Sequence, residues 1–191
     1  MKKAALIVFG TLLIIFGLLV PLATTVITFL LPETFAASAT ILHTNANPAL
    51  LAGMVAKVQS QAVLDQAIAD LNLRAEWGRK YKQPGELPAA KISAILKGNI
   101  EVTQVRGTNL MEIKVLSDNK DEAAGMANKL ASIYLSATPG AAVAVPAFSN
   151  PTPVRPNKPV NITIGAVVGA FLILPGTLLL IAARRSKHPA Q

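Results

Sequence analysis

The chain has 191 residues, of which 52% are hydrophobic and only 15% are charged, and it contains no cysteine. This composition is too apolar for an ordinary soluble domain, and the absence of cysteine excludes thiol nucleophiles, thiolate zinc sites and disulfide bonds. The formal net charge is +8, but much of it comes from the two tails, which carry Lys2, Lys3, Arg184, Arg185 and Lys187. A nucleic-acid partner is therefore not expected.

The first predicted element is a membrane-spanning helix over residues 4–31, within an uncharged run from Ala4 to Pro32. Roughly 20 apolar residues suffice to cross a bilayer. Lys2 and Lys3 before the run, and the small residues Ala37–Ala39 after it, also resemble a cleaved signal peptide. The apolar core of a signal peptide has only about 7–15 residues, so we expect an uncleaved anchor behind a cytoplasmic tail of residues 1–3.

A strand and a long helix are predicted next. Alternate residues are apolar in FAASATILHT, which predicts a strand over Phe35–Thr44. Asn47–Pro48 is typical of a helix start, because Asn caps free amides and Pro already has helical φ. Apolar residues then recur at spacings of three and four from Leu51, which predicts one amphipathic helix to about Leu73. Gly and Pro residues predict a loop over Arg74–Pro88.

A short helix and a hairpin follow in the prediction. The helix covers Ala89–Lys97, and alternating apolar residues then predict strands over Ile100–Val105 and Leu110–Leu116. Because these strands flank Arg106–Asn109, which has the composition of a turn, an antiparallel hairpin is the simplest arrangement.

A second long helix completes the predicted domain. Asn119 and Glu122 have the spacing of a capping box, and a buried stripe continues until just before Thr138. A further apolar stretch covers Ala141–Phe148. The expected fold class is therefore α+β, with helices packed on an antiparallel or mixed sheet in a domain of residues 32–149, flanked by two transmembrane helices.

A proline-rich tether connects this domain to the second membrane helix. Residues 150–159 (NPTPVRPNKP) contain Pro151, Pro153, Pro156 and Pro159, which predicts a stiff, polyproline-like segment. The second transmembrane helix is expected at residues 160–183, before a tail of residues 184–191. Because both short tails are purely basic, both termini are expected in the cytoplasm and the domain on the other side of the membrane.

Two pairs of glycines are candidates for helix contacts. Gly165 and Gly169 have the GxxxG spacing that lets membrane helices approach closely, and Gly10 and Gly17 share a face of the first span. The contact could form within one chain or between subunits. The alternative is that glycine is simply frequent in membrane helices.

A basic and aromatic segment is the candidate for contact with a glycan or a neighbouring subunit. In RAEWGRKYK, aromatic rings that can stack on sugars alternate with cations that can hold phosphates or lipid headgroups. The candidate residues are Arg74, Trp77, Arg79, Lys80 and Tyr81. The alternative is a solvated loop with Trp77 tucked into the core.

Arg106 is a further contact candidate, although turn chemistry alone explains its neighbours Gly107 and Asn109.

Catalysis is not expected. The sequence has no phosphate-binding P-loop and no GxSxG motif, and its two histidines, His43 and His188, are far apart. We therefore expect no catalytic residue, cofactor or metal.

Three stretches, LNLRAEWG (71–78), RGTNLMEIKVLSDNKDEAAGMANKLASIYLS (106–136) and PTPVRPNKPVNITIGAVVG (151–169), resemble the Wzz-type chain-length determinants, or polysaccharide co-polymerases, of bacterial inner membranes. The resemblance implies a non-catalytic homo-oligomer with a periplasmic domain. Such a protein regulates a surface polysaccharide, namely lipopolysaccharide O-antigen, capsule or exopolysaccharide, through contacts with membrane lipid, a polymerase or export machinery, and the nascent glycan. Alternatives are an adaptor of a separate cytoplasmic tyrosine kinase in polysaccharide export, or a membrane anchor of an unrelated assembly.

The sequence departs from this family in one respect. Family members usually carry a long helical arm before the proline-rich segment, whereas here only Leu135–Ser149 separate Tyr134 from Asn150. The resemblance therefore covers a short form that lacks the arm.

Overall fold

The computed structural model describes residues 2–44, 53, 55–82 and 85–185. The chain forms two compact units, of which one combines Met1–Pro32 with Arg155–Gln191 and the other is Glu33–Val154. The predicted helix start at Asn47–Pro48 lies outside the described residues.

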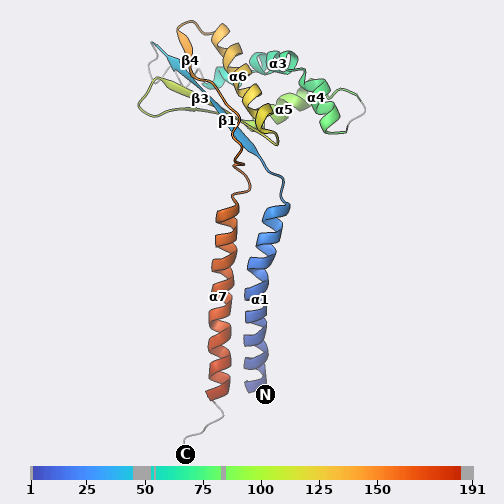
Figure 1. Ribbon diagram of the computed structural model, residues 1–191, viewed down its shortest axis with the longest axis vertical. Helices are drawn as coiled ribbons and strands as arrows, with labels where there is room; N and C mark the ends of the chain where they lie inside the picture. The colour runs from blue at the N-terminus through green and yellow to red at the C-terminus, as the bar shows by residue number, and fades with distance from the viewer. Residues whose placement is uncertain (1, 45–52, 54, 83–84, 186–191) are drawn as a thin grey trace, which may run out of the picture. The chain divides into compact units, whose positions relative to one another are not determined.

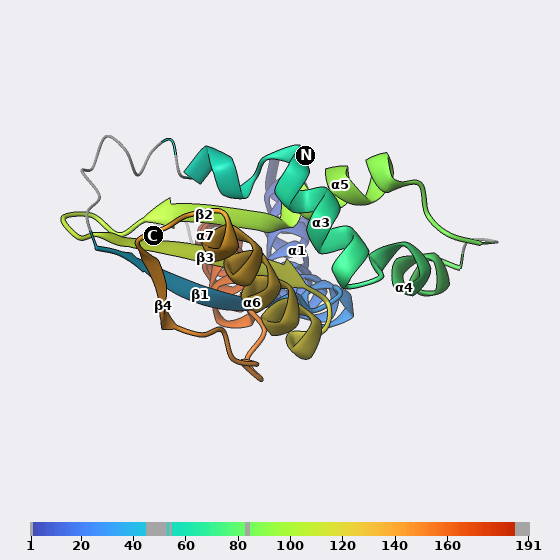
Figure 2. The same ribbon diagram turned by 90° about the horizontal axis from the view of Figure 1, so that it is seen from above.

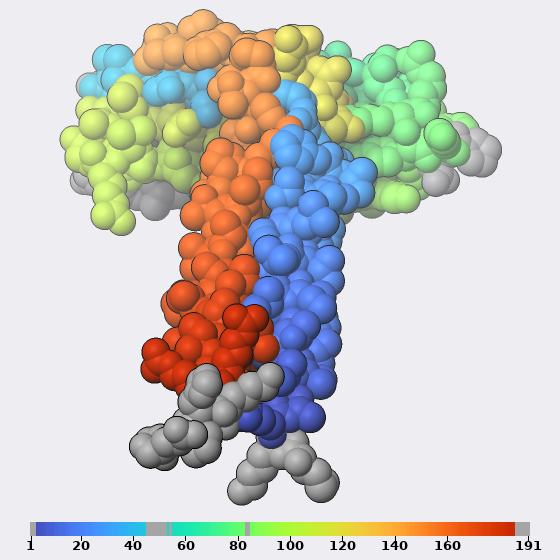
Figure 3. Space-filling view, turned by 60° about the horizontal axis from the view of Figure 1, so that its bottom comes forward, coloured from blue at the N-terminus to red at the C-terminus, as the bar shows by residue number. Residues whose placement is uncertain are grey.

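The first unit is a pair of long apolar helices, α1 (Lys2–Leu30) and α7 (Lys158–Arg185), that lie side by side (Figures 1 and 3). Both are long and apolar enough to cross a membrane, with mean hydropathies of 2.7 and 2.4. Only 11% and 17% of their most apolar segments is buried, unlike the core helix of a soluble protein. These helices are therefore candidate membrane spans, as the sequence predicts.

Helix α7 begins earlier than predicted, and it includes Lys158 and Pro159 from the expected tether. The side chain of Asn157 accepts a hydrogen bond from the backbone N–H of Val160, which satisfies an otherwise free amide of the first turn. Proline is compatible with that turn because its missing N–H has no partner there. In the remaining tether, the Arg155–Pro156 peptide bond is cis.

The second unit contains a four-stranded sheet in the order β2-β3-β1-β4. Its strands are β1 (Phe35–His43), β2 (Ile100–Gln104), β3 (Leu110–Ser117) and β4 (Ala141–Val145). All neighbouring strands are antiparallel, which resolves the open choice between an antiparallel and a mixed sheet and confirms the predicted β2–β3 hairpin.

The core lies against one face of this sheet. Alternate residues of β1 and β3 are buried, and the register pairs Ala39 with Ile113 and Ile41 with Met111, all of which have no exposed surface. Helix α6 (Lys120–Ser136) packs on β1 and β3, and α3 (Gln61–Asp70) packs on α6 and α5 (Ala89–Asn99), as Figure 2 shows from above. The α+β class is thus as predicted.

The helical segment before Leu73 differs from the prediction of one continuous helix. A break at Ser60, whose ψ of 149° is extended, separates the turns before it from α3. A second break occurs at Asn72, whose φ of 49° is left-handed. Neither side chain makes a capping hydrogen bond, but asparagine adopts the left-handed region more readily than most other residues.

The first half of the expected loop over Arg74–Pro88 is also helical, since α4 spans Leu73–Lys80. Gly78 does not interrupt this helix. A Cβ at Gly78 would collide with the carbonyl oxygen of Gly85, so this glycine permits a close approach of the following loop. The helix ends before Lys82, whose φ is 52°.

The segment between α6 and the second membrane-span candidate begins with a short strand and is held against α6 by hydrogen bonds. Strand β4 pairs with β1 at the edge of the sheet. Beyond it, the side-chain amide of Asn128 makes two hydrogen bonds of 2.8 Å, accepting from the N–H of Ala147 and donating to its carbonyl oxygen. This double contact fixes the chain after β4 against the helix.

Candidate functional site

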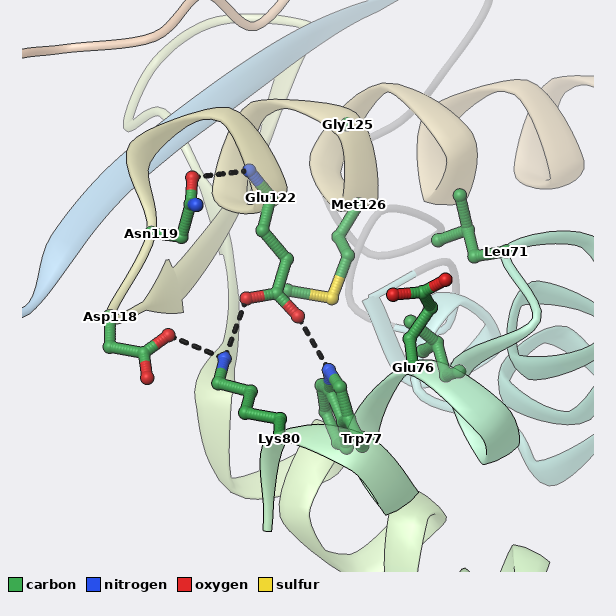
Figure 4. A pocket seen from close by; sticks show the side chains of 10 residues that line it. Leu71, Glu76, Trp77, Lys80, Asp118, Asn119, Glu122, Gly125 and Met126 are labelled. Atoms are coloured by element: carbon green, nitrogen blue, oxygen red, sulfur yellow. Dashed lines mark hydrogen bonds and ion pairs between the residues drawn. The ribbon is translucent and has the colours of Figure 1, made fainter. Parts of the chain in front are cut away.

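The candidate site lies where α4 meets the start of α6. Trp77 is 3% exposed, and its indole Nε1–H donates to Oε1 of Glu122 at 2.5 Å. The other carboxylate oxygen, Oε2, accepts from Ser117 at 2.6 Å and from Lys80 at 2.8 Å. Three donors from α4 and β3 therefore converge on one carboxylate of α6 (Figure 4).

Asn119 positions this carboxylate by capping α6. Its side-chain oxygen accepts from the N–H groups of Asp121 and Glu122, as the capping-box prediction required. The reciprocal half of the predicted box is wrong, because the side chain of Glu122 turns to Trp77, Lys80 and Ser117, and the N–H of Asn119 donates to Ser117 instead. The carboxylate of Glu122 binds Trp77 and Lys80 rather than the N–H of Asn119, because Trp77 offers a buried donor and Lys80 a positive charge.

The charges in this cluster stabilise one another. Burial alone would raise the pKa of Glu122, but hydrogen bonds from Lys80, Ser117 and Trp77 and the charge of Lys80 outweigh it, so the pKa lies below its usual value. Burial would lower the pKa of Lys80, but its hydrogen bonds to Asp118 and Glu122 and their charges raise the pKa overall. Both groups are therefore charged at neutral pH.

A hollow of about 590 Å³ lies beside this cluster, between α4 and α6 (Figure 4). Apolar side chains from both sides line it, together with a polar set that comprises three carboxylates, one ammonium group and one amide. The apolar residues are Leu71, Leu73, Trp77 and Met126, and the polar ones are Glu76, Lys80, Asp118, Asn119 and Glu122. A hollow of this size and mixed lining can hold a small ligand or a protruding side chain.

The structure places the predicted basic and aromatic residues on α4 and just after it, and most of their charges are already paired. Arg74 contacts Glu86 at 3.3 Å, Arg79 contacts Glu76 at 2.5 Å, and Lys80 contacts both Asp118 and Glu122. Trp77 is buried, in line with the alternative that it belongs to the core, while Tyr81 is 47% exposed. Only Lys80 of these cations lines the hollow, together with three carboxylates, so the lining of the hollow is acidic on balance.

Arg106 lies in the β2–β3 turn, away from α4 (Figure 2). Its side chain is exposed, and no hydrogen bond or ion pair to it is found among the described residues. The turn itself is closed by hydrogen bonds from the N–H of Val105 to Leu110 and from the N–H of Thr108 to Val105. Gly107, with φ of 73°, supplies the left-handed position that this turn needs.

The candidate glycines meet within the helix pair. A Cβ on Gly17 would lie 2.8 Å from the carbonyl oxygen of Gly169, and a Cβ on Gly10 would lie 2.9 Å from that of Gly176. A Cβ on Gly165 would lie 2.8 Å from the Cβ of Thr24. The small residues thus let α1 and α7 of the same chain approach closely.

The helix contact includes residues that the sequence analysis missed. Gly10, Gly17 and Thr24 are spaced by seven, and so are Gly169, Gly176 and Ala183 on α7, where all three are buried. A seven-residue repeat of small residues is a signal for a closely packed, left-handed helix pair. Large side chains such as Phe171, 73% exposed, point away from this seam.

The four tether prolines lie outside both the hollow and the helix seam. Pro151 and Pro153 belong to the sheet unit, where the N–H of Val154 donates to the carbonyl of Thr34 at 2.8 Å. Pro156 follows the cis bond, and Pro159 lies in the first turn of α7.

Glu122 and Asp118 are site residues that the sequence analysis missed. Glu122 lies 45 positions from its indole donor, so no local pattern identifies this partner.

Compared with known proteins, the chain matches no protein-family model and no curated protein.

Proposed function

We propose that this protein is a non-catalytic, oligomeric membrane scaffold that regulates the chain length, assembly or export of a bacterial surface polysaccharide. In this proposal α1 and α7 cross the inner membrane, both termini are cytoplasmic, and the sheet unit is periplasmic. The partners are membrane lipid, the polymerase or export machinery, and the nascent glycan.

The observation that carries the proposal concerns the three stretches that resemble Wzz-type proteins. Residues 71–78 and 106–136 meet through Trp77 and Glu122, whose hydrogen bond joins α4 to α6. The third stretch, 151–169, contains Gly165 and Gly169, which approach α1. The similar residues are thus those that hold the parts of each unit together, which favours a shared architecture over a chance likeness of separate segments.

The short segment after α6 shapes the proposed mechanism. Because β4 and the Asn128 contact occupy Leu135–Ser149, any influence on polymer length comes from the sheet unit itself rather than from an extended arm. Several copies would each present weak contacts to the polymerase or glycan, and multivalency would make these contacts effective together.

The test is a gel profile of surface polysaccharide from cells with and without the gene. A collapse of the modal chain length with polymer still made supports length regulation, and loss of polymer supports a role in assembly or export. An unchanged profile contradicts the proposal. If the phosphorylation state of a separate tyrosine kinase changes before the profile does, the adaptor alternative replaces direct regulation.

Two variants connect this readout to the structure. Replacing Gly165 and Gly169 with Leu would force α1 and α7 apart, so complementation with this variant should fail. Ala170→Leu is the matched control, because Ala170 is exposed on the same helix and the larger side chain should be tolerated in lipid.

A further inference from the structure

A second, smaller hollow of about 160 Å³ opens in the sheet unit, where the ends of α4, α5 and β3 meet the start of β1. This volume corresponds to about five water molecules, which suits a small polar group better than a sugar chain. The lining shares Trp77, Lys80 and Asp118 with the larger hollow and adds Thr34, Tyr81, Asn99, Leu116 and Ser117.

The sheet register explains why these residues gather at one end of the unit. Ile100 at the start of β2 pairs with Val115, which in turn pairs with Ala37 of β1. Asn99 precedes Ile100 in the chain, so it lies at the same end of the sheet as Thr34, the residue before β1.

This end of the unit is also the end at which the chain leaves α1. Only three residues, 31–33, lie between Leu30, the last residue of α1, and Thr34. Four residue steps span at most about 14 Å even when the chain is fully extended. If α1 crosses the membrane, as proposed above, Thr34 and the hollow beside it lie within reach of lipid headgroups, whatever the orientation of the unit.

Several donor groups of this hollow have N–H or O–H bonds left for a ligand. Within the described part of the chain, no hydrogen bond engages the hydroxyl groups of Thr34 and Tyr81 or the side-chain amide of Asn99. The ammonium group of Lys80 has three N–H donors, and its contacts with two carboxylates use two of them (Figure 4). Donors that converge beside a cation are suited to a phosphate group.

The hollow also offers one acceptor. Asp118 uses Oδ1 for Lys80 and Ser117, whereas its Oδ2 accepts no hydrogen bond from the residues that the structure describes. The side chain of Asp118 is 56% exposed, so a ligand can reach it. A ligand with a phosphate and an N–H donor would therefore match both parts of the lining. An ethanolamine phosphodiester has this combination, whereas choline has no N–H to donate.

We propose that this hollow binds the headgroup of phosphatidylethanolamine. The phosphate accepts hydrogen bonds from Lys80 and from the three uncommitted side chains, and the ammonium group of the headgroup donates to Asp118. The opposite charges of the headgroup then lie next to those of the protein. This inference rests on the membrane arrangement in the proposed function and specifies a lipid that the sheet unit contacts.

Titration with two lipids tests the proposal. The full-length chain in detergent micelles receives short-chain phosphatidylethanolamine or phosphatidylcholine, and native mass spectrometry counts the bound lipid. Emission from Trp77, which lines the hollow and is the only tryptophan, is followed in parallel. Phosphatidylethanolamine should bind saturably, and phosphatidylcholine should bind at least tenfold more weakly. Equal affinities, or no saturable binding of phosphatidylethanolamine, would overturn the proposal.

Two further probes distinguish the source of the phosphate and the role of the amine. Glycerophosphoethanolamine has the same headgroup without acyl chains, and it should bind more weakly because only the lipid is concentrated in the micelle. Equally tight binding would overturn the lipid as the source. Phosphatidylglycerol offers hydroxyl groups in place of the ammonium group, and equal affinity for it would overturn the contact with Asp118.

Substitutions of similar shape test the lining residues. Thr34→Val and Tyr81→Phe each remove one hydroxyl group, and together they should lower the affinity for phosphatidylethanolamine at least tenfold. Thr103→Val is the matched control, because Thr103 is an exposed threonine of β2 outside the hollow. An unchanged affinity in the double variant, or an equal loss in the control, would overturn the proposal. If the double variant does not fold, Tyr81→Phe alone provides the test, because Tyr81 is exposed.

The polysaccharide profile separates this proposal from the proposed function. Absence of lipid binding with a gene-dependent profile contradicts only the headgroup site. A gene-independent profile contradicts the proposed function, whereas selective lipid binding by the purified chain would still support the headgroup site.

Discussion

Glu122→Ala is the substitution with the largest expected effect on the sheet unit. It removes the acceptor of three side-chain hydrogen bonds, from Trp77, Lys80 and Ser117. The indole N–H is the most costly loss, because Trp77 is 3% exposed and water cannot easily replace the carboxylate. The Lys80 ammonium group keeps Asp118 as a partner, so the loss of its contact with Glu122 costs less free energy.

The magnitude follows from these two contributions. An unpaired buried donor costs about 1–3 kcal/mol, and a largely surface ion pair contributes up to about 1 kcal/mol, so the free energy of unfolding should fall by about 1–4 kcal/mol. Glu122→Gln keeps an acceptor for the indole and should cost only about 1 kcal/mol. Glu101→Ala is the matched control, because Glu101 forms an exposed ion pair with Lys114; its effect should stay within about 0.5 kcal/mol.

The assay is urea unfolding of the full chain in detergent micelles, followed by tryptophan fluorescence. Trp77 is the only tryptophan, so the signal reports this contact and the sheet unit alone. The reasoning is refuted if Glu122→Ala unfolds at the same urea concentration as Glu101→Ala, or if Glu122→Gln destabilises the unit as much as Glu122→Ala does.

Three further predictions concern pH, the helix pair and the cap. Burial holds the pKa of His43 below its usual value, so its contribution to stability is present above the unfolded pKa of about 6.5 and is lost as the pH falls through the folded pKa. Stability should therefore decline from pH 7 to pH 5 in wild type and in His188→Gln but not in His43→Gln, as urea unfolding at each pH would show. Gly169→Leu should separate α1 from α7, because a Cβ there would lie 2.5 Å from the carbonyl oxygen of Gly17; spin-label distances between the helices should lengthen, and an unchanged distribution would contradict the close-packed seam. Asn119→Ala should lower the free energy of unfolding by about 1 kcal/mol, measured by urea unfolding, and no change would mean that the cap is dispensable.

Local patterns in the sequence predict much of the fold. The alternation along β1 and β3 reflects a sheet with one buried face, and the Asn119 cap marks the start of α6 because its signal lies within one helical turn. The uncharged runs predict α1 and α7 because length and composition alone suffice to identify such helices. These features depend on neighbours in the sequence.

The remaining features depend on partners far apart in the chain. Glu122 has the spacing of a capping box, yet its side chain binds Trp77 and Lys80, more than 40 positions away. Gly78 resembles a helix breaker but instead makes room for the backbone at Gly85. Arg79 pairs with Glu76 inside the basic segment, but the carboxylate partners of Arg74 and Lys80 lie outside it, and no count within the segment reveals them.

The seam between α1 and α7 has a consequence for biosynthesis. Helix α1 ends at Leu30 and α7 at Arg185, so at about 5–20 residues per second roughly 10–30 s of translation separate the two. In the membrane arrangement proposed above, the groove of Gly10 and Gly17 lacks its partner helix during that time and is open to lipid. A chain truncated before α7 would keep this groove exposed, so it should be degraded faster in the cell than the full-length chain.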